Sequence, residues 1–185
     1  MIRTTLALLL LTLLAGCSRV QTSSEIDAGT DFAGLKTYAW LTDEEPKAED
    51  IRLNDPRIGT IVRDAVDQVL TEKGYTKVEQ EEADFLVVWF GAIEKKIKKE
   101  NIEHFYAPYG YGTLYRDPAL RTGASGTARE YEEGTVIIDV LDPRTRDILW
   151  RGSGSGRLVE GQQEQIALNN LRRSVKKIVQ PFPVR

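Results

Sequence analysis

The sequence predicts an α+β domain, a two-layer sandwich in which two amphipathic helices cover one face of a mainly antiparallel sheet. Segments 58–74 and 162–179 repeat apolar residues with a helical period. Between them, residues 85–90 form an unbroken apolar run, and segments 135–141 and 148–158 flank a turn as in a β-hairpin. With a short strand before the first helix, the element order is β-α-β-β-β-α.

The first sixteen residues have the composition of a secretory signal peptide. Arg3 supplies a positive start, and the apolar run 6–14 is too short to span a bilayer as a helix. The following residues complete the motif Leu-Ala-Gly-Cys at 14–17, which resembles the lipobox of bacterial lipoproteins. This resemblance implies cleavage of residues 1–16, acylation of Cys17, and attachment of the mature chain to a membrane facing the periplasm.

The residues after the expected cleavage site bear on the membrane and on the tether. In lipoproteins an Asp after the acylated cysteine resembles an inner-membrane retention signal, so Ser18 at this place predicts the outer membrane. Residues 17–30 are polar and are expected to form a flexible lipidated tether, which leaves 31–185 as a single domain. Cys17 is the only cysteine of the chain, so the core alone must hold this domain together.

The first two elements of the domain have clear boundaries. Residues 36–41 predict a short strand. Asp55 suits the N-cap of the helix that follows, Pro56 its first position, and Gly74 the position after its end. The apolar stripe of this helix consists of Ile58, Ile61, Val62, Ala65, Val66, Val69 and Leu70.

The apolar run 85–90 predicts a central strand that is covered on both faces. Charged residues follow it at 94–99 and cannot belong to the core. They form an over-long strand end, a solvated helical turn, or a basic patch that touches lipid headgroups.

Residues 104–134 form a long connection rich in tyrosine and glycine. Connections of this length are uncommon and tend to be functional or disordered. Aromatic rings interleaved with glycine either fold back over an apolar sheet face or make an adaptable contact surface. The candidate binding surface consists of Phe105, Tyr106, Tyr109, Tyr111 and Tyr115.

Two features of the hairpin predict specific contacts. Gly152, Gly154 and Gly156 alternate, so they lie on one face of their strand and let a helix, or a large ring from the neighbouring strand, approach the backbone. Asp139 lies among apolar neighbours and needs a partner if it is buried, for which Arg151 on the facing strand is a candidate. In the last helix, the apolar stripe consists of Leu168, Leu171, Val175 and Ile178.

Nothing in the sequence singles out a catalytic or metal site. His104 is the only histidine, so a Cys/His metal cluster and a serine–histidine couple both lack partners. The glycines at 152–156 do not match a dinucleotide fingerprint, because Arg157 stands where the third glycine belongs. With 25 basic and 28 acidic side chains, no basic excess suggests nucleic acid. We therefore expect no enzyme, metal, cofactor or nucleic-acid partner.

Five short motifs resemble one family in their order along the chain. They lie at 31–40, at the Lys-Gly-Tyr that ends the first helix, and at 83–87, 133–139 and 149–152. The chain is similar over residues 31–184 to bacterial lipoproteins that carry domain of unknown function 4136. This resemblance implies an envelope lipoprotein with a small α+β domain, and the family brings no assigned catalytic residues.

Together these features predict a non-enzymatic envelope module that binds a protein partner or itself. The alternative is a module that binds a small ligand or a lipid in a pocket between the sheet and the aromatic connection.

Overall fold

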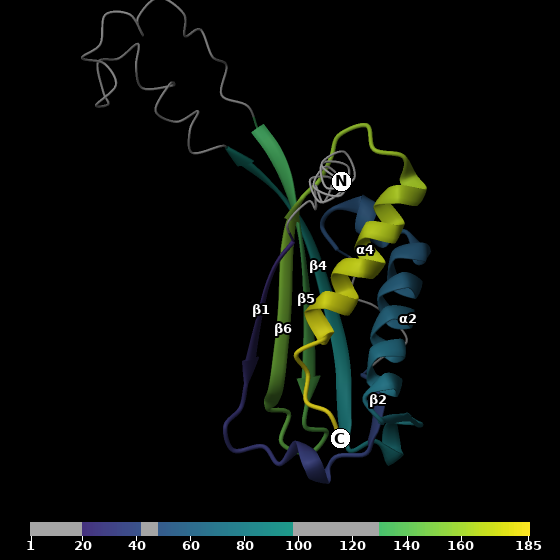
Figure 1. The fold of residues 1–185 in the computed structure, drawn as a ribbon, viewed down its shortest axis with the longest axis vertical. Helices are drawn as coiled ribbons and strands as arrows, with labels where there is room; N and C mark the ends of the chain where they lie inside the picture. The colour runs from purple at the N-terminus through teal and green to yellow at the C-terminus, as the bar shows by residue number, and fades with distance from the viewer. Residues whose placement is uncertain (1–19, 42–47, 98–129) are drawn as a thin grey trace, which may run out of the picture.

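The computed structural model describes residues 20–41, 48–97 and 130–185, which form one six-stranded sheet with two helices on one of its faces (Figure 1). The helices are α2 (Pro56–Glu72) and α4 (Glu164–Val179), and short 3-10 turns are η2 (Phe32–Gly34), η3 (Ile51–Asn54) and η4 (Gln80–Glu82). The strands are β1 (Gln21–Ile26), β2 (Thr37–Trp40), β3 (Thr76–Lys77), β4 (Phe85–Ile97), β5 (Glu130–Leu141) and β6 (Ile148–Arg157).

The strand order in the sheet is β1-β6-β5-β4-β2-β3. The pairs β1–β6, β6–β5 and β5–β4 are antiparallel, whereas β2 runs parallel to both β4 and β3. The predicted fold class is confirmed, since two helices cover one face of a mixed, mostly antiparallel sheet. The strands β1 and β3 are additional to the predicted element order.

The expected tether is wrong where it includes residues 21–26, because these residues form β1 at the edge of the sheet. Every residue of β1 is exposed, so the strand shows no apolar alternation from which it could be recognised. Backbone pairing with β6 holds it in place, with Gln21 opposite Ser155 and Ile26 opposite Trp150. The folded domain therefore begins at β1 and not at residue 31.

The long connection is shorter than expected at its C-terminal side, because residues 130–134 belong to β5. Three of these residues are glutamates, so the segment shows no apolar alternation from which a strand could be predicted. The same pairing extends β4 through Ile97, so residues 94–97 form a strand end, one of the forms expected for the charged segment.

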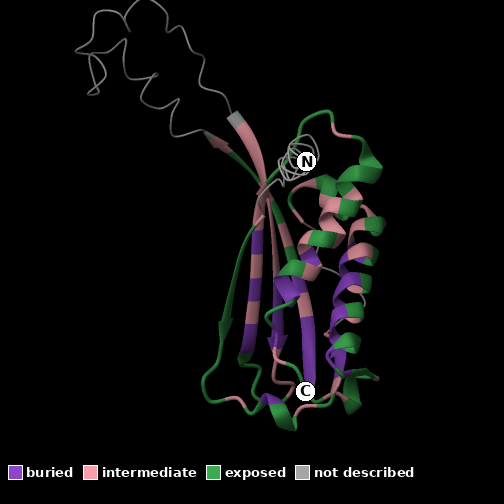
Figure 2. Ribbon diagram, viewed as in Figure 1, coloured by how far each residue is buried: buried purple, intermediate pink, exposed green. Residues whose placement is uncertain are grey.

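The first helix forms as its sequence predicts. The Asp55 carboxylate accepts a hydrogen bond from the backbone N–H of Arg57 at 2.9 Å, and Pro56 opens the helix. Gly74 follows its end with φ +93°, a conformation that a residue with a Cβ rarely adopts. Along α2 the residues that face the sheet are buried, and those on the outer side are exposed (Figure 2).

The helices meet the sheet at the predicted glycine face. A Cβ atom on Gly154 would lie 2.7 Å from two side-chain carbons of Ile178 in α4, and one on Gly152 would lie 2.2 Å from the Trp150 ring. The helix expected at these glycines is therefore present, whereas the ring comes from Trp150 of β6 itself and not from the neighbouring strand, as had been predicted. Because these glycines have no side chain, α4 packs close to the backbone of β6.

A polar contact joins α2 to β2 beside this core. The Asp67 carboxylate accepts hydrogen bonds from the Tyr38 hydroxyl and the Trp40 indole N–H, both at 3.0 Å. Lys77 donates to the other carboxylate oxygen at 2.9 Å. Burial, together with the Asp67 charge, raises the pKa of Tyr38 well above its usual range.

Candidate functional site: the open face of the sheet

The face of the sheet opposite the helices is the candidate functional site, and we call it the open face. Side chains alternate between the two faces along each strand, and the residues that pack with the helices identify one of them. The opposite positions on β4, β5 and β6 bring six apolar residues and three polar ones together: Leu86, Val88, Phe90, Ile137, Leu141 and Ile148, with Asp139, Arg151 and Ser153.

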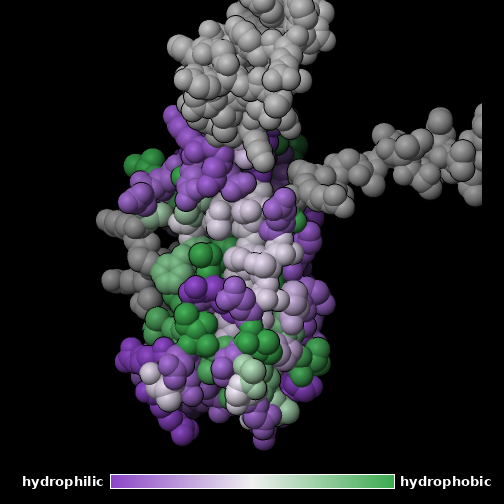
Figure 3. All heavy atoms as spheres, turned by 90° about the vertical axis from the view of Figure 1, so that its left-hand side faces the viewer, coloured by the Kyte–Doolittle hydropathy of each residue, from purple (hydrophilic) through white to green (hydrophobic). Residues whose placement is uncertain are grey.

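Register places the apolar residues of the open face side by side. Phe90 lies opposite Ile137, and Leu141 lies between Leu86 and Ile148 on the two neighbouring strands. Phe90 and Ile148 are each 44% exposed although both are large apolar residues. Figure 3 shows apolar atoms gathered over the middle and lower part of this side of the molecule.

A β-bulge explains how Ile148 reaches the open face. The register between β5 and β6 shifts at Val140 and Leu141, so that β6 carries one extra residue there. As a result both Leu149 and Trp150 belong to the core cluster, while Ile148 pairs with Leu141. A regular strand would have turned Ile148 toward the helices.

A row of charges crosses the open face. Asp139, 3% exposed, receives two hydrogen bonds from the Arg151 guanidinium, at 2.7 and 2.6 Å. This is the partner that the sequence predicted for Asp139. The Asp139 contact, with the nearby Glu25 charge, raises the pKa of Arg151, so that the arginine stays charged while its side chain is 42% exposed. Next to these charges, the Ser23 and Ser153 hydroxyl groups share a hydrogen bond of 2.8 Å.

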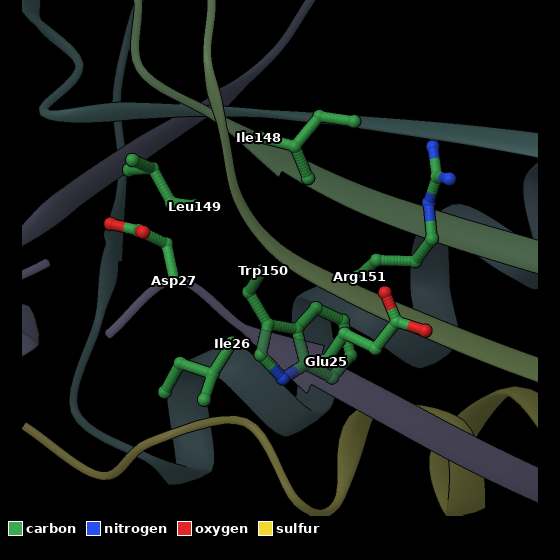
Figure 4. A pocket seen from close by; sticks show the side chains of 7 residues that line it. All are labelled: Glu25, Ile26, Asp27, Ile148, Leu149, Trp150 and Arg151. Atoms are coloured by element: carbon green, nitrogen blue, oxygen red, sulfur yellow. The ribbon is translucent and has the colours of Figure 1, made fainter. Parts of the chain in front are cut away.

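A small pocket of about 210 Å³ lies where β1 leaves the sheet beside the bulge. Its walls come from residues 25–27 and 148–151 (Figure 4). Sites for drug-sized ligands usually occupy about 300–1,000 Å³, so this pocket is smaller than a typical small-molecule site.

The sequence-predicted site residues are not among those that the structure describes. Cys17 and the five aromatic residues of the expected binding surface, Phe105, Tyr106, Tyr109, Tyr111 and Tyr115, fall outside the described residues, as does His104. Sequence reasoning did not name Phe90 or Ile148 as contact residues. The available signal was the apolar run 85–90, which needs cover on both faces and receives helices on only one.

Two further features are absent from the part of the chain that the structure describes. Among residues 20–41, 48–97 and 130–185, no three His, Cys, Asp or Glu side chains come together as a metal site would require. In the same part of the chain, neither helix is long and apolar enough to cross a membrane.

The model of the domain of unknown function DUF4136 matches residues 22–184. The chain belongs to this family. The match begins inside β1, in agreement with the strand that sequence reasoning had missed. No curated protein gives a significant match to the chain.

Solved structures are similar to this chain at the level of the fold. A PDZ domain protein from Parabacteroides distasonis superposes with a TM-score of 0.54 at 17% identity, over 89% of this chain and 36% of its own length. This chain thus spans about a third of that protein. PelC from Paraburkholderia phytofirmans, described as a dodecamer, gives a TM-score of 0.49 at 13% identity over 90% of this chain and 99% of its own.

Proposed function

We propose that this protein is a lipid-anchored envelope lipoprotein whose domain binds a protein partner through the open face of its sheet, without catalysis. The observation that carries the proposal is the one-sided cover of the sheet: α2 and α4 bury one face, while Phe90 and Ile148 remain 44% exposed on the other. The lipobox at 14–17 supports the anchor, and its Ser18 supports the outer membrane.

The composition of the open face favours a protein over a lipid as its partner. Protein interfaces that form and dissociate combine an apolar centre with aromatic residues, arginine and hydrogen-bonding groups. Here Phe90 and Ile137 supply the apolar part, and Arg151 offers a charged group held in place by Asp139. The Arg151 side chain is 42% exposed, so it can donate further hydrogen bonds to an acceptor on a partner, and these would offset the loss of its remaining water.

A photo-crosslinking amino acid placed at position 90 in living cells tests the proposal. We expect it to capture a reproducible protein partner, or a second copy of the chain. The matched control places the same amino acid at Val184, which is also an exposed apolar residue (69%) and lies at the C-terminus. A partner captured equally at both positions, or at neither, contradicts binding through the open face.

The anchor is tested by a separate variant, Cys17→Ser. We expect the variant to be recovered apart from membranes, while the unchanged chain is recovered with them. Recovery of both in the same fraction contradicts acylation of Cys17.

A further inference from the structure

We propose that one end of the domain rests on the lipid surface, through four apolar residues at that end: Ile51, Leu158, Val159 and Ile166. The inference rests on the proposed acylation of Cys17 and adds to it a contact surface and an orientation. It begins from the length of chain between the lipid and the sheet.

The tether is short because β1 is part of the sheet. Residue 20 is the first one described, and the Val20 side chain lies beside β6, with its Cγ2 atom 3.4 Å from where a Cβ on Gly156 would be. Only two residues separate Cys17 from Val20, and the three steps along the chain between them span at most about 11 Å. A tether that ran to residue 31 would instead have reached about 50 Å.

This length brings the sheet to the headgroups. The acyl chains of Cys17 lie in the hydrocarbon core, and the headgroup layer above it is about 5–8 Å thick in each leaflet. Val20 therefore lies within or just above the headgroups. The domain cannot be held away from the lipid.

Several elements share this end of the domain. β1 begins here and β6 leads into α4, while β4 and β5 run on past Val20, because the register places Ile93, Gly134 and Gly156 at its level (Figure 1). Arg52 in η3 reaches Glu132 of β5, and Arg57 at the start of α2 pairs with Glu164 at the start of α4, so both helices also begin here. We call it the tethered end.

Exposed apolar residues are concentrated at the tethered end. The described residues contain eight large apolar side chains that are exposed, and four of them are here. Ile51 is 82% exposed, Leu158 38%, Val159 57% and Ile166 45%. The cost of exposing them to water falls if they insert among lipid headgroups and upper acyl chains.

The charges at the tethered end do not select an anionic lipid. Arg52 pairs with Asp50 and Glu132, Arg57 with Asp55 and Glu164, and Lys96 with Glu94. Each of these cations is thus neutralised by a neighbour, and Lys95 and Arg157 lie opposite Glu132 and Glu133 in the sheet. Contact with the bilayer comes from the apolar side chains, so neutral and anionic lipids are expected to serve equally.

The test places an environment-sensitive fluorophore at single positions of the acylated full-length protein in vesicles of phosphatidylcholine. Cys17 is the only cysteine, and acylation occupies its thiol, so one introduced cysteine is the only labelling site. Val159→Cys is compared with Ile26→Cys, which is 56% exposed at the other end of β1. Ile166→Cys is compared with Ile148→Cys, which is 44% exposed on β6.

We expect labels at 159 and 166 to shift to shorter emission wavelength and to be quenched by nitroxide-bearing lipid, and labels at 26 and 148 to be quenched by aqueous iodide. Replacing a third of the lipid by phosphatidylglycerol should not change this pattern. If the protein floats with vesicles while all four labels stay accessible to iodide, the lipid contact is refuted and the anchor stands. If the protein does not float, the anchor itself fails. Unchanged circular dichroism of each labelled variant excludes misfolding as the cause.

Discussion

Replacing Gly154 by alanine is expected to loosen the contact between β6 and α4. The new Cβ would lie 2.7 Å from the Cγ1 and Cδ1 atoms of Ile178, whereas carbon atoms in contact prefer about 3.5–4.0 Å. Ile178 is 1% exposed, so it has no free space into which to move. Overpacking of this kind costs about 1–3 kcal/mol, and the lower entropy of the unfolded alanine chain returns up to about 1 kcal/mol.

The control is Gly156→Ala, on the same face of the same strand. Its Cβ would meet only Val20, at 3.4 Å, which is ordinary contact. This variant therefore keeps the entropic gain of about 0.5–1 kcal/mol and pays no steric cost. The two alanine variants should differ in free energy of unfolding by about 2 kcal/mol, with Gly154→Ala the less stable.

Urea unfolding followed by tryptophan fluorescence measures this difference through the midpoint and the slope. A second variant, Ile178→Ala, tests the cause. Alone it should lower the free energy of unfolding by about 2–5 kcal/mol. In combination with Gly154→Ala it removes the clashing atoms, so the double variant should lose less stability than the sum of the losses of the two single variants. Equal stabilities of Gly154→Ala and Gly156→Ala, or strict additivity with Ile178→Ala, would refute the steric account of this strand.

Three further predictions concern carboxylates. Asp67→Ala leaves the Tyr38 hydroxyl and the neighbouring indole N–H without the Asp67 acceptor and should lower the free energy of unfolding by about 3 kcal/mol. Asp67→Asn should lose less, because its amide oxygen still accepts a hydrogen bond, and equal losses of the two variants in urea unfolding would contradict this. Asp139→Asn should cost about 2–3 kcal/mol, because it removes the charge that balances Arg151 and one of the two acceptor oxygens, and the 42% exposure of Arg151 keeps the loss below that of a fully buried pair; a loss below 1 kcal/mol in thermal unfolding would show that the pair is not needed. The hydrogen bond from Arg52 lowers the pKa of Asp50 to about 2, below the 3.8 of an unperturbed carboxyl. As the pH falls, Asp50 therefore binds a proton in the unfolded chain before it does so in the folded protein. The ionised carboxylate stabilises the fold fully above about pH 5, and this contribution is lost as the pH falls toward 2. The melting temperature of Asp50→Asn should fall less over this interval than that of the unchanged protein.

The sequence predicted those elements whose residues carry a local signal. Around α2, the N-cap Asp55, the opening Pro56 and the closing Gly74 all act within one or two residues of their position. The alternating glycines and the Asp139–Arg151 pair were predictable for a related reason: a bare strand face and a charge among apolar neighbours each demand a particular kind of contact.

The strand β1 was not predictable from such signals. Its residues Gln21–Ile26 are all exposed, so no buried face gives the strand an apolar pattern. What holds β1 is backbone hydrogen bonding to β6, and any residue except proline can supply that. The start of β5 was missed for the same reason, since Glu132 and Glu133 pair through their backbones across the sheet.

The candidate site was predictable only in outline. The run 85–90 indicates that both faces of β4 need cover, but which residues of β5 and β6 join it on the open face depends on the register of the three strands. A single extra residue at the β6 bulge decides whether Ile148 faces helix or solvent. Bulges depend on long-range pairing, which a local pattern does not contain. The aromatic surface predicted at 105–115 remains a prediction.

The two proposals have a joint consequence for how a partner approaches. If the tethered end rests on the lipid, the strands stand away from the membrane, because β1, β4, β5 and β6 all have one end there. Phe90 lies three residues from Ile93, the β4 residue at the level of Val20, which places it about 10 Å along the strand from the point of attachment. The open face is then presented sideways, above the headgroups. Its partner must extend at least that far from the membrane, as a neighbouring anchored domain of similar height does and a peptide lying flat in the bilayer surface does not.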